Sequence, residues 1–383
     1  MLEQYKLSMP KAVFSGSNAI EQIETIVNGY YRKVAVFTDK GIRHSGVIDE
    51  PLAILNRCNT EIVILDDLPA EPTYLEAQSV VDDFKKSGAD FIIAIGGGSV
   101  MDMAKLASIA CTGSYTIKDL LADPLLGKKL VKTLMIPTTA GTGSEATPNS
   151  IVTVPEQNLK VGIVNAELIA DYVILDGRMI RKLPKKIAAA TGIDALAHAI
   201  ECYTSNKANP FSNMFAMEAL KLIFANIIPA CVDAGAEQEK NNMLLAAFYA
   251  GVAITASGTT GVHALSYPLG GRYHIPHGVS NAIMLLPVLK YNKEVCLEEF
   301  SSVYDMVAGP DQHSREEKAD WILGQIHSMI DRLEIPVSLK TFGIGEADLN
   351  DLVHDAMEVK RLLANNKREI TPEDARKLYL EIM

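Results

Sequence analysis

The stretch FIIAIGGGSVMD, residues 91–102, passes from an apolar run into three consecutive glycines and then into residues that suit a helix. The apolar run predicts a buried strand, and glycines at a strand-to-helix turn let the backbone approach an anion closely. The amides and positive dipole end of a helix that begins here would bind a phosphate group, although the spacing is not GxGxxG. A tight turn explains one or two of the glycines but explains three in a row poorly. We therefore interpret the stretch as a phosphate-binding turn.

The chain around this turn alternates short β-branched runs with amphipathic stretches, which is the pattern of a parallel sheet with crossover helices. Helices are expected at 72–87 and at 99–111, the second with Ser99 as its N-cap. Strands are expected at 11–14 (at an edge), 33–38, 61–65, 90–95, 133–137 and 171–176, with a hairpin formed by 150–154 and 160–164. The first half thus predicts a Rossmann-like α/β domain built on a doubly wound parallel sheet.

The alternation stops at residues 181–184, RKLP, and a continuous helical pattern follows. Helices are expected at 185–203, 212–232, 239–253, 279–289, 315–333 and 348–363. A last helix is expected after Thr371, because a threonine N-cap followed by a proline and two acids is a helix start signal. We therefore expect two domains, 1–183 for the α/β dinucleotide-binding domain and 184–383 for an all-helical domain.

Length and charge limit the classes of protein that fit. The chain has 383 residues, 48% of them hydrophobic, so each of two domains can bury a core. The net charge of −11 repels phosphate backbones and anionic membrane surfaces, so neither nucleic acid nor membrane is expected as a partner. No targeting segment is apparent, and apolar runs such as 282–289 are too short to span a bilayer. With five scattered cysteines, which suit a reducing compartment, these features predict a cytoplasmic protein.

A second group of residues suits a metal ion. Asp194 and His198 lie four residues apart in an expected helix and therefore share one face. His263 and His277 follow in a segment punctuated by glycine and proline, where the backbone could turn them toward that face. Three nitrogens and one oxygen suit a divalent transition metal. The Asp–His pair alone would favour an ordinary helix-surface hydrogen bond, so the metal interpretation depends on the two later histidines.

Two further features leave alternatives open. The loop IPTTAGTGSE, residues 136–145, follows an expected strand and could contact phosphate or ribose, or could be a plain polar loop. Asp39 ends the expected strand 33–38, where it could accept hydrogen bonds from ribose hydroxyls and repel a 2′-phosphate. A lone aspartate after a strand is more often a turn residue.

Four segments in this order resemble the iron-containing (group III) alcohol dehydrogenase family, whose fold is similar to that of dehydroquinate synthase. They are GGGS at 96–99 with Asp102, PTTAGTGSE at 137–145, TGIDALAHAIE at 191–201 and HALSYPLGGRYHIPHG at 263–278. The resemblance extends from Phe14 to residues 362–366. It implies an N-terminal dinucleotide-binding domain, a C-terminal helical domain, and a metal and substrate cleft between them.

The resemblance also implies roles for individual residues. The metal ligands, through which catalysis would proceed, fall on Asp194, His198, His263 and His277. The cofactor contacts fall on Asp39, Gly96, Gly97, Gly98, Ser99, Asp102, Thr138, Thr139, Thr142 and Lys160. The implied cofactors are NAD(H) and a divalent metal, Fe(II) by the family's name, although nitrogen and oxygen ligands also accept Zn(II).

The chain departs from the family pattern at two places. Many members have a second histidine four residues after the third ligand, and Tyr267 stands there instead. A proton relay through that histidine cannot be carried over. Tyr267 and the nearby His274 are candidates for proton handling, although an isolated extra histidine in a loop is more often structural. Glu71 stands where many relatives have asparagine near the cofactor.

The activity that the resemblance implies is hydride transfer between NAD(H) and a small alcohol or aldehyde, in an enzyme that forms a homodimer or a higher homo-oligomer. One alternative is an NAD- and metal-dependent lyase resembling dehydroquinate synthase. That reaction calls for basic residues that bind a substrate phosphate and carboxylate, and Arg272 is the only obvious one between His263 and His277. The other alternative is a catalytically silent nucleotide-binding protein, against which the intact ligand set and glycines speak.

Overall fold

The computed structural model describes residues 4–111, 113–157 and 159–383, which form two compact units. The sheet unit contains Ser8–Leu183 together with Ala234–Gly251. The helical unit contains Pro184–Asp233 and Val252–Met383, along with residues 4–7. The assignment of 1–183 and 184–383 as functional domains stays a prediction.

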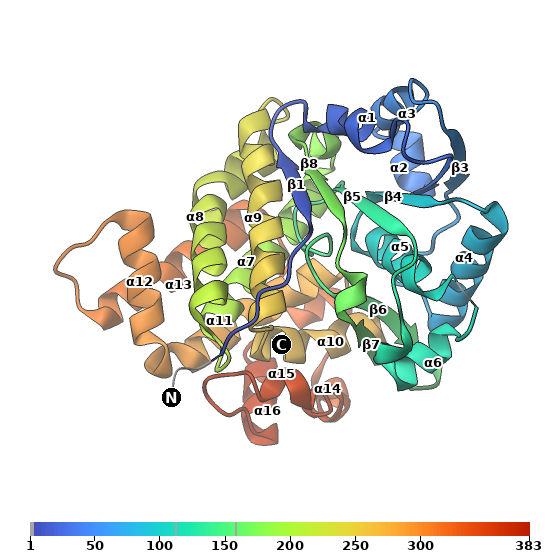
Figure 1. The fold of residues 1–383 in the computed structure, drawn as a ribbon. Coiled ribbons are helices and arrows are strands. Elements are labelled where there is room, and N and C mark those ends of the chain that lie inside the picture. Colours follow the sequence, from blue (N-terminus) through green and yellow to red (C-terminus); the bar gives the residue numbers. More distant parts are fainter. Residues whose placement is uncertain (1–3, 112, 158) are drawn as a thin grey trace. The chain divides into compact units, whose positions relative to one another are not determined.

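The sheet unit is built on six parallel strands in the order β1-β8-β5-β4-β2-β3 (Figure 1). They are β1 (Ala12–Ser15), β2 (Lys33–Phe37), β3 (Glu61–Leu65), β4 (Phe91–Gly96), β5 (Lys132–Pro137) and β8 (Tyr172–Leu175). A separate antiparallel hairpin pairs β6 (Asn149–Val154) with β7 (Leu159–Val164). The chain adds β3 on one side of β2 and then adds β4 and β5 on the other side, so the direction of winding reverses between β2 and β4. Ligands of open α/β sheets bind at such a reversal.

Helices cover both faces of this sheet. Val34 and Val36 of β2, with Ile93 and Ile95 of β4, pack in one core cluster with α1 (Gln22–Val27) and α3 (Asp49–Leu55). Side chains alternate along a strand, so the residues between them face the other side, where α4 (Tyr74–Ser87) and α5 (Gly98–Ala110) pack. Two short helices, α2 (Lys40–Ser45) and α6 (Ile117–Ala122), complete the unit. The doubly wound fold predicted from the sequence is confirmed.

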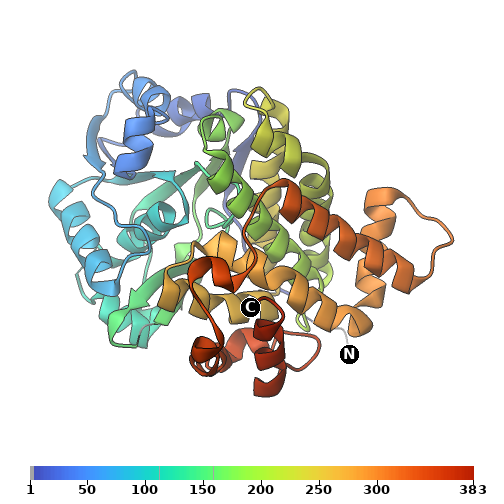
Figure 2. The ribbon, with the colours of Figure 1, turned by 180° about the vertical axis from the view of Figure 1, so that it is seen from behind.

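The second half of the chain is helical, as predicted, and Figure 2 shows it from behind in green to red. Within the helical unit α7 packs against α8 and α11, α10 packs against α11 and α14, and α12 packs against α13. The bounds are α7 (Lys185–Tyr203), α8 (Pro210–Val232), α9 (Glu237–Ala256), α10 (Gly261–Tyr273), α11 (His277–Asn292), α12 (Leu297–Ala308), α13 (Arg315–Arg332), α14 (Leu349–Met357), α15 (Lys360–Leu363) and α16 (Pro372–Leu380).

Several local predictions were wrong. Ser99 is not an N-cap, because α5 begins at Gly98 and Gly97 precedes it. The helix expected at 348–363 is two helices, α14 and α15, and neither α10 nor α12 was predicted. The start signal at Thr371 is confirmed, since its hydroxyl accepts from the Asp374 amide and the Asp374 carboxylate accepts from the Thr371 amide.

The expectation that no apolar run could span a bilayer also needs correction. Among the described residues α8 is long and apolar enough to cross a membrane, and the bent pair α9 and α10 passes the same test if counted as one span. These criteria use length and composition only, and a core helix of a folded domain meets them too. The helix α8 packs along α7 and against α12.

Candidate metal centre and nucleotide-binding turn

Three helices of the helical unit carry the four predicted ligands. Asp194 and His198 lie one turn apart on α7, His263 lies in the first turn of α10, and His277 is the first residue of α11. The start of α11 lies directly against α7, because a Cβ atom on Gly278 would come within 2.2 Å of the Ala190 carbonyl oxygen. Only glycine fits there, and this close approach brings His277 beside Asp194.

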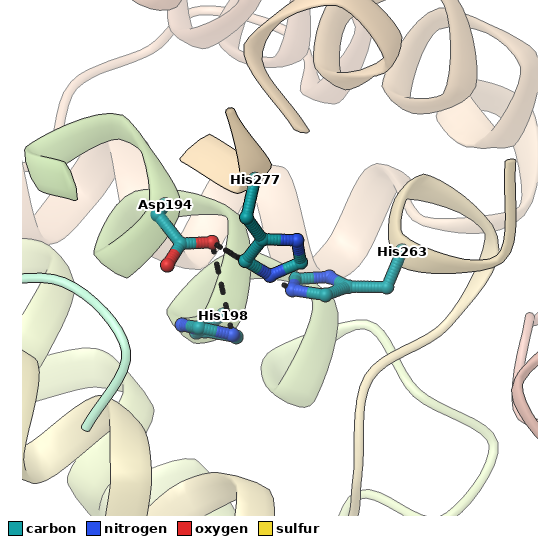
Figure 3. Close-up of side chains that lie close together, drawn as sticks. All are labelled: Asp194, His198, His263 and His277. Atoms are coloured by element: carbon teal, nitrogen blue, oxygen red, sulfur yellow. Dashed lines mark ion pairs between the residues drawn. The ribbon is translucent and has the colours of Figure 1, made fainter. Parts of the chain in front are cut away.

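The four side chains present one ligand atom each to a common point (Figure 3). These atoms all lie within 4.8 Å of one another, and the Nε2 atoms of His198, His263 and His277 lie 3.9, 3.8 and 3.6 Å from Asp194 Oδ1. Donors about 2.1 Å from a metal at tetrahedral angles are about 3.4 Å apart, so the set fits a divalent ion after small movements. His277 alone among the four is partly exposed, which leaves one side of the set accessible.

The carboxylates and imidazoles of the site stabilise one another's charged forms. Burial by itself would raise the pKa of Asp194, but His198, His277 and His263 hold the pKa below its usual value. Burial would lower the pKa of His263, yet Glu201 and Asp194 raise it above the ordinary histidine value. The lowered pKa of Asp194 and the raised pKa of His263 both mean that the surroundings stabilise an ionised carboxylate next to positive charge.

Sequence reasoning missed two residues that contact the ligands. The Asn281 amide Nδ2 lies 2.6 Å from Asp194 Oδ1, 3.1 Å from His263 Nε2 and 3.2 Å from His277 Nε2. Glu201 accepts a hydrogen bond from Nδ1 of His263. Each lies one helical turn beyond a predicted ligand, Glu201 after His198 and Asn281 after His277, and that spacing is the only sequence signal that could have found them.

The two candidates for proton handling are placed differently. The ring of Tyr267 lies beside those of His263 and His277, with centroids 6.3 and 6.1 Å apart, and burial raises the pKa of Tyr267 to about 12. His274 caps the C-terminus of α10 in the left-handed conformation, with φ 55°, and is not part of the four-residue set.

The glycine turn of the sheet unit joins β4 to α5. A Cβ atom on Gly97 would lie 3.6 Å from the Thr139 hydroxyl, and one on Gly98 would lie 3.0 Å from Thr142 Cγ2. The Thr138 amide donates to the Gly96 carbonyl at 3.0 Å, so the loop after β5 lies directly beside the turn. The N-cap of α5 is Gly97, which has no side chain to cap the helix. The first amides of a helix have no partner within it, and next to small residues they fit a pyrophosphate.

Other predicted cofactor residues have partners within the sheet unit. Asp102 accepts from the Ser144 hydroxyl at 2.5 Å and from the Ile151 amide at 2.8 Å, so it holds the loop before β6. Lys160 forms an ion pair of 2.6 Å with Glu71, and the hydroxyl of Ser99 accepts from the Glu71 amide. Their cofactor contacts stay predictions.

Asp39 follows β2, next to the reversal of winding between β2 and β4. Its Oδ1 accepts from the Ile42 amide at 2.8 Å, which makes it the N-cap of α2. Asp39 therefore does act as a turn residue, which is one of the two roles considered for it from the sequence. A carboxylate has a second oxygen that could also accept from a ribose hydroxyl, so the cofactor role stays a prediction.

Comparisons with known proteins point to one family. Residues 10–177 match the family model for iron-containing alcohol dehydrogenase, and residues 188–383 match the C-terminal model of the Fe-containing alcohol dehydrogenase family.

Long-chain-alcohol dehydrogenase 1 of Geobacillus thermodenitrificans is 32% identical over 98% of this chain and 95% of its own length. A crystal structure of 1,3-propanediol oxidoreductase has TM-score 0.92 and 28% identity and covers 100% of both chains. The NAD⁺ complex of sulfoacetaldehyde reductase from Bifidobacterium kashiwanohense has TM-score 0.88 and 26% identity over 100% of this chain and 99% of the other. The chain belongs to the iron-containing alcohol dehydrogenase family and is an oxidoreductase that acts on CH–OH groups.

Proposed function

We propose that this alcohol dehydrogenase transfers a hydride between NAD(H) and a small alcohol or aldehyde, with a divalent metal held by Asp194, His198, His263 and His277. The observation that carries the proposal is the convergence of four ligand atoms from three helices to within 4.8 Å of one another. The bound metal would supply a Lewis acid that stabilises negative charge on the substrate oxygen.

The chain's own residues have separate tasks in this proposal. Asp194 contributes the single negative charge of the ligand set, and Asn281 donates to its Oδ1 and so fixes the carboxylate. The partly exposed side near His277 admits the substrate oxygen. In the sheet unit, the amides at the start of α5 bind the pyrophosphate, and Asp39 binds the adenosine ribose and disfavours a 2′-phosphate. Ser99, Asp102, Thr138, Thr139, Thr142 and Lys160 complete the proposed cofactor contacts.

The finer identity of cofactors and partners is part of the proposal. The family's name favours Fe(II), and three nitrogens with one oxygen also accept Zn(II). The solved relative with NAD⁺ supports NAD(H). Relatives are named for long-chain alcohols, 1,3-propanediol and sulfoacetaldehyde, compounds that share neither a chain length nor a charge. We therefore propose an alcohol or an aldehyde as the substrate and no narrower class. We further propose that the protein is cytoplasmic, in keeping with the net charge of −11 and the free cysteines. We also propose a homodimer or higher homo-oligomer, as the resemblance to the family implies.

The basic residue considered for the lyase alternative is already paired. Arg272 donates to Asp355 at 2.7 Å and to Asp351 at 2.9 Å, so its charge is already paired with two carboxylates. A free cation for a substrate phosphate is therefore not provided by this residue.

The test is a turnover screen. Protein stripped of metal and then loaded with Fe(II) or Zn(II) is assayed with NAD⁺ against diols, primary alcohols and hydroxy acids, and with NADH against the matching aldehydes. We expect metal-dependent turnover of at least one pair. Failure of every pair with either metal, in protein that binds NADH, would favour the catalytically silent nucleotide-binding protein.

A further inference from the structure

Glu201 is a buried carboxylate that belongs to neither the ligand set nor the substrate side. It lies on α7, three residues after His198, and only 1% of its surface is exposed. An isolated ionised carboxylate is very costly to bury, so its partners must compensate for the lost hydration. Both of its oxygens have partners, Oε1 at the start of α10 and Oε2 at the His263 ring.

One oxygen of Glu201 holds the start of α10. Oε1 accepts from the Thr260 amide at 3.0 Å, from the Thr260 hydroxyl at 2.8 Å and from the Val262 amide at 2.7 Å. The first amides of a helix have no partner within the helix, and Thr260 does not cap α10 with its own side chain. A carboxylate from α7 therefore takes the place of an N-cap and fixes the turn that carries His263.

The other oxygen fixes the imidazole itself. Oε2 accepts from Nδ1 of His263, and because an ionised carboxylate can only accept, Nδ1 must carry a proton. On the far side of the ring, Asn281 Nδ2 lies 3.1 Å from His263 Nε2. The Ser266 hydroxyl donates to Asn281 Oδ1 at 2.5 Å, which turns the Nδ2 donor toward the histidine. An amide nitrogen only donates, so the Asn281 contact is a hydrogen bond in the tautomer with a lone pair on Nε2, which is the tautomer that a proton on Nδ1 gives.

We propose that Glu201 is a positioning residue that keeps His263 in the tautomer and orientation in which Nε2 binds the metal. The inference rests on the proposed metal site. Its alternative is that Glu201 only stabilises the start of α10, in which case metal affinity would not depend on the charge of the side chain. Carboxylates that accept from a metal-bound histidine commonly change metal affinity by about 10- to 100-fold.

The substitution Glu201→Gln separates the two roles. The amide oxygen takes over the Thr260 and Val262 bonds, so the start of α10 keeps its acceptor. The amide nitrogen then faces His263 Nδ1 and donates to it, which moves the ring proton onto Nε2 and removes the lone pair that binds the metal. We expect the affinity of the metal-free protein for Co(II), measured by chelator competition, to fall at least tenfold, about the lower end of that range. The visible absorption of the bound Co(II) should also change.

The matched control is Thr260→Val, which removes one donor to the same carboxylate but leaves the contact with His263. We expect it to lower the melting temperature while Co(II) affinity stays within twofold of wild type. A Glu201→Gln variant that binds Co(II) as tightly as wild type would overturn the inference. If the wild type itself fails to bind Co(II), the proposed metal site fails instead, so the two failures are distinguishable.

A measurement on the wild type keeps the inference testable should Glu201→Gln not fold. Nitrogen NMR of Zn(II)-loaded, histidine-labelled protein should show His263 protonated at Nδ1 and metal-bound through Nε2. Metal binding through Nδ1 would overturn the inference.

Discussion

The metal centre of the helical unit and the glycine turn of the sheet unit are built in opposite ways. The metal centre consists of side chains that contact one another. Asn281 contacts three of the ligands, and Glu201 makes a separate hydrogen bond to His263. The glycine turn consists of backbone amides at a helix start whose N-cap is Gly97, beside hydroxyl residues of the next loop. The metal centre depends on the nitrogen and oxygen atoms of its side chains, whereas the glycine turn depends on the lack of Cβ atoms.

This difference predicts how each site fails. The metal centre should be broken by substitutions that remove a nitrogen or an oxygen. The glycine turn should be broken by substitutions that add a carbon, even where the protein itself has room for it.

Removing one ligand should have the largest effect. His277→Ala should lose most bound metal and reduce turnover by about a thousandfold or more, because a Lewis acid contributes several kcal/mol of charge stabilisation. The fold should survive, since His277 is at the start of α11 and partly exposed. Metal analysis and circular dichroism on the same sample check both statements. The matched control is His274→Asn, which keeps a residue that tolerates the left-handed conformation. Equal metal loss in the control would show that the wrong histidine was chosen.

Removing a charge in the sheet unit should have the next largest effect. Asp39→Asn keeps an oxygen that can cap α2, so stability should change little, while the like charge that opposes a 2′-phosphate is lost. We expect the preference for NADH over NADPH in kcat/KM to fall by roughly a hundredfold, a few kcal/mol for an unpaired charge near a phosphate. Asp39→Gly should behave alike with slightly lower stability. A wild type that prefers NADPH would make Asp39 a turn residue only.

Adding a methyl group tests the glycine turn. In Gly97→Ala the new Cβ would meet only Thr139, at 3.6 Å, and the backbone conformation suits alanine, so the melting temperature should stay close to wild type. The dissociation constant for NADH should nevertheless rise about tenfold or more, because the methyl group occupies space that a phosphate needs.

The contrasting variant is Gly96→Ala, whose Cβ would come within 2.6 Å of Val100. Such overpacking costs about 1–3 kcal/mol, so this variant should lose stability first. Unchanged NADH binding by Gly97→Ala, measured by fluorescence titration, would argue against a pyrophosphate at this turn.

The sequence predicted the sheet unit well because its signals are local. A strand such as Glu61–Leu65 needs only a β-branched run, and the helix α4 carries its own start signal at Thr73. The sequence-based prediction failed at α10, where Pro268, Gly270 and Gly271 suggested a loop. Packing of α10 against α11 and α14 overrides those weak helix formers, and such contacts are invisible along the chain.

The same reason separates the ligands from the residues that support them. Asp194 and His198 are neighbours on one helix, so their spacing is readable. Glu201 and His263 are 62 residues apart, and Asn281 and Asp194 are 87 apart. Only the fold brings these pairs together, which is why neither Glu201 nor Asn281 was predicted.

The smallest effect is expected at Tyr267, where the chain departs from the family pattern. Tyr267 lies beside two ligands, but its hydroxyl makes no hydrogen bond to any residue that the structure describes. Tyr267→Phe keeps the ring and removes only this hydroxyl, so the packing against His263 and His277 is retained. We expect kcat to change by less than about fivefold, because loss of a hydroxyl without a protein partner costs about 1 kcal/mol or less. Metal content and NADH affinity should match wild type. A large fall in kcat with unchanged metal content and NADH affinity would show that the hydroxyl contacts the substrate. Tyr267 would then be a side chain outside the ligand set that the reaction requires.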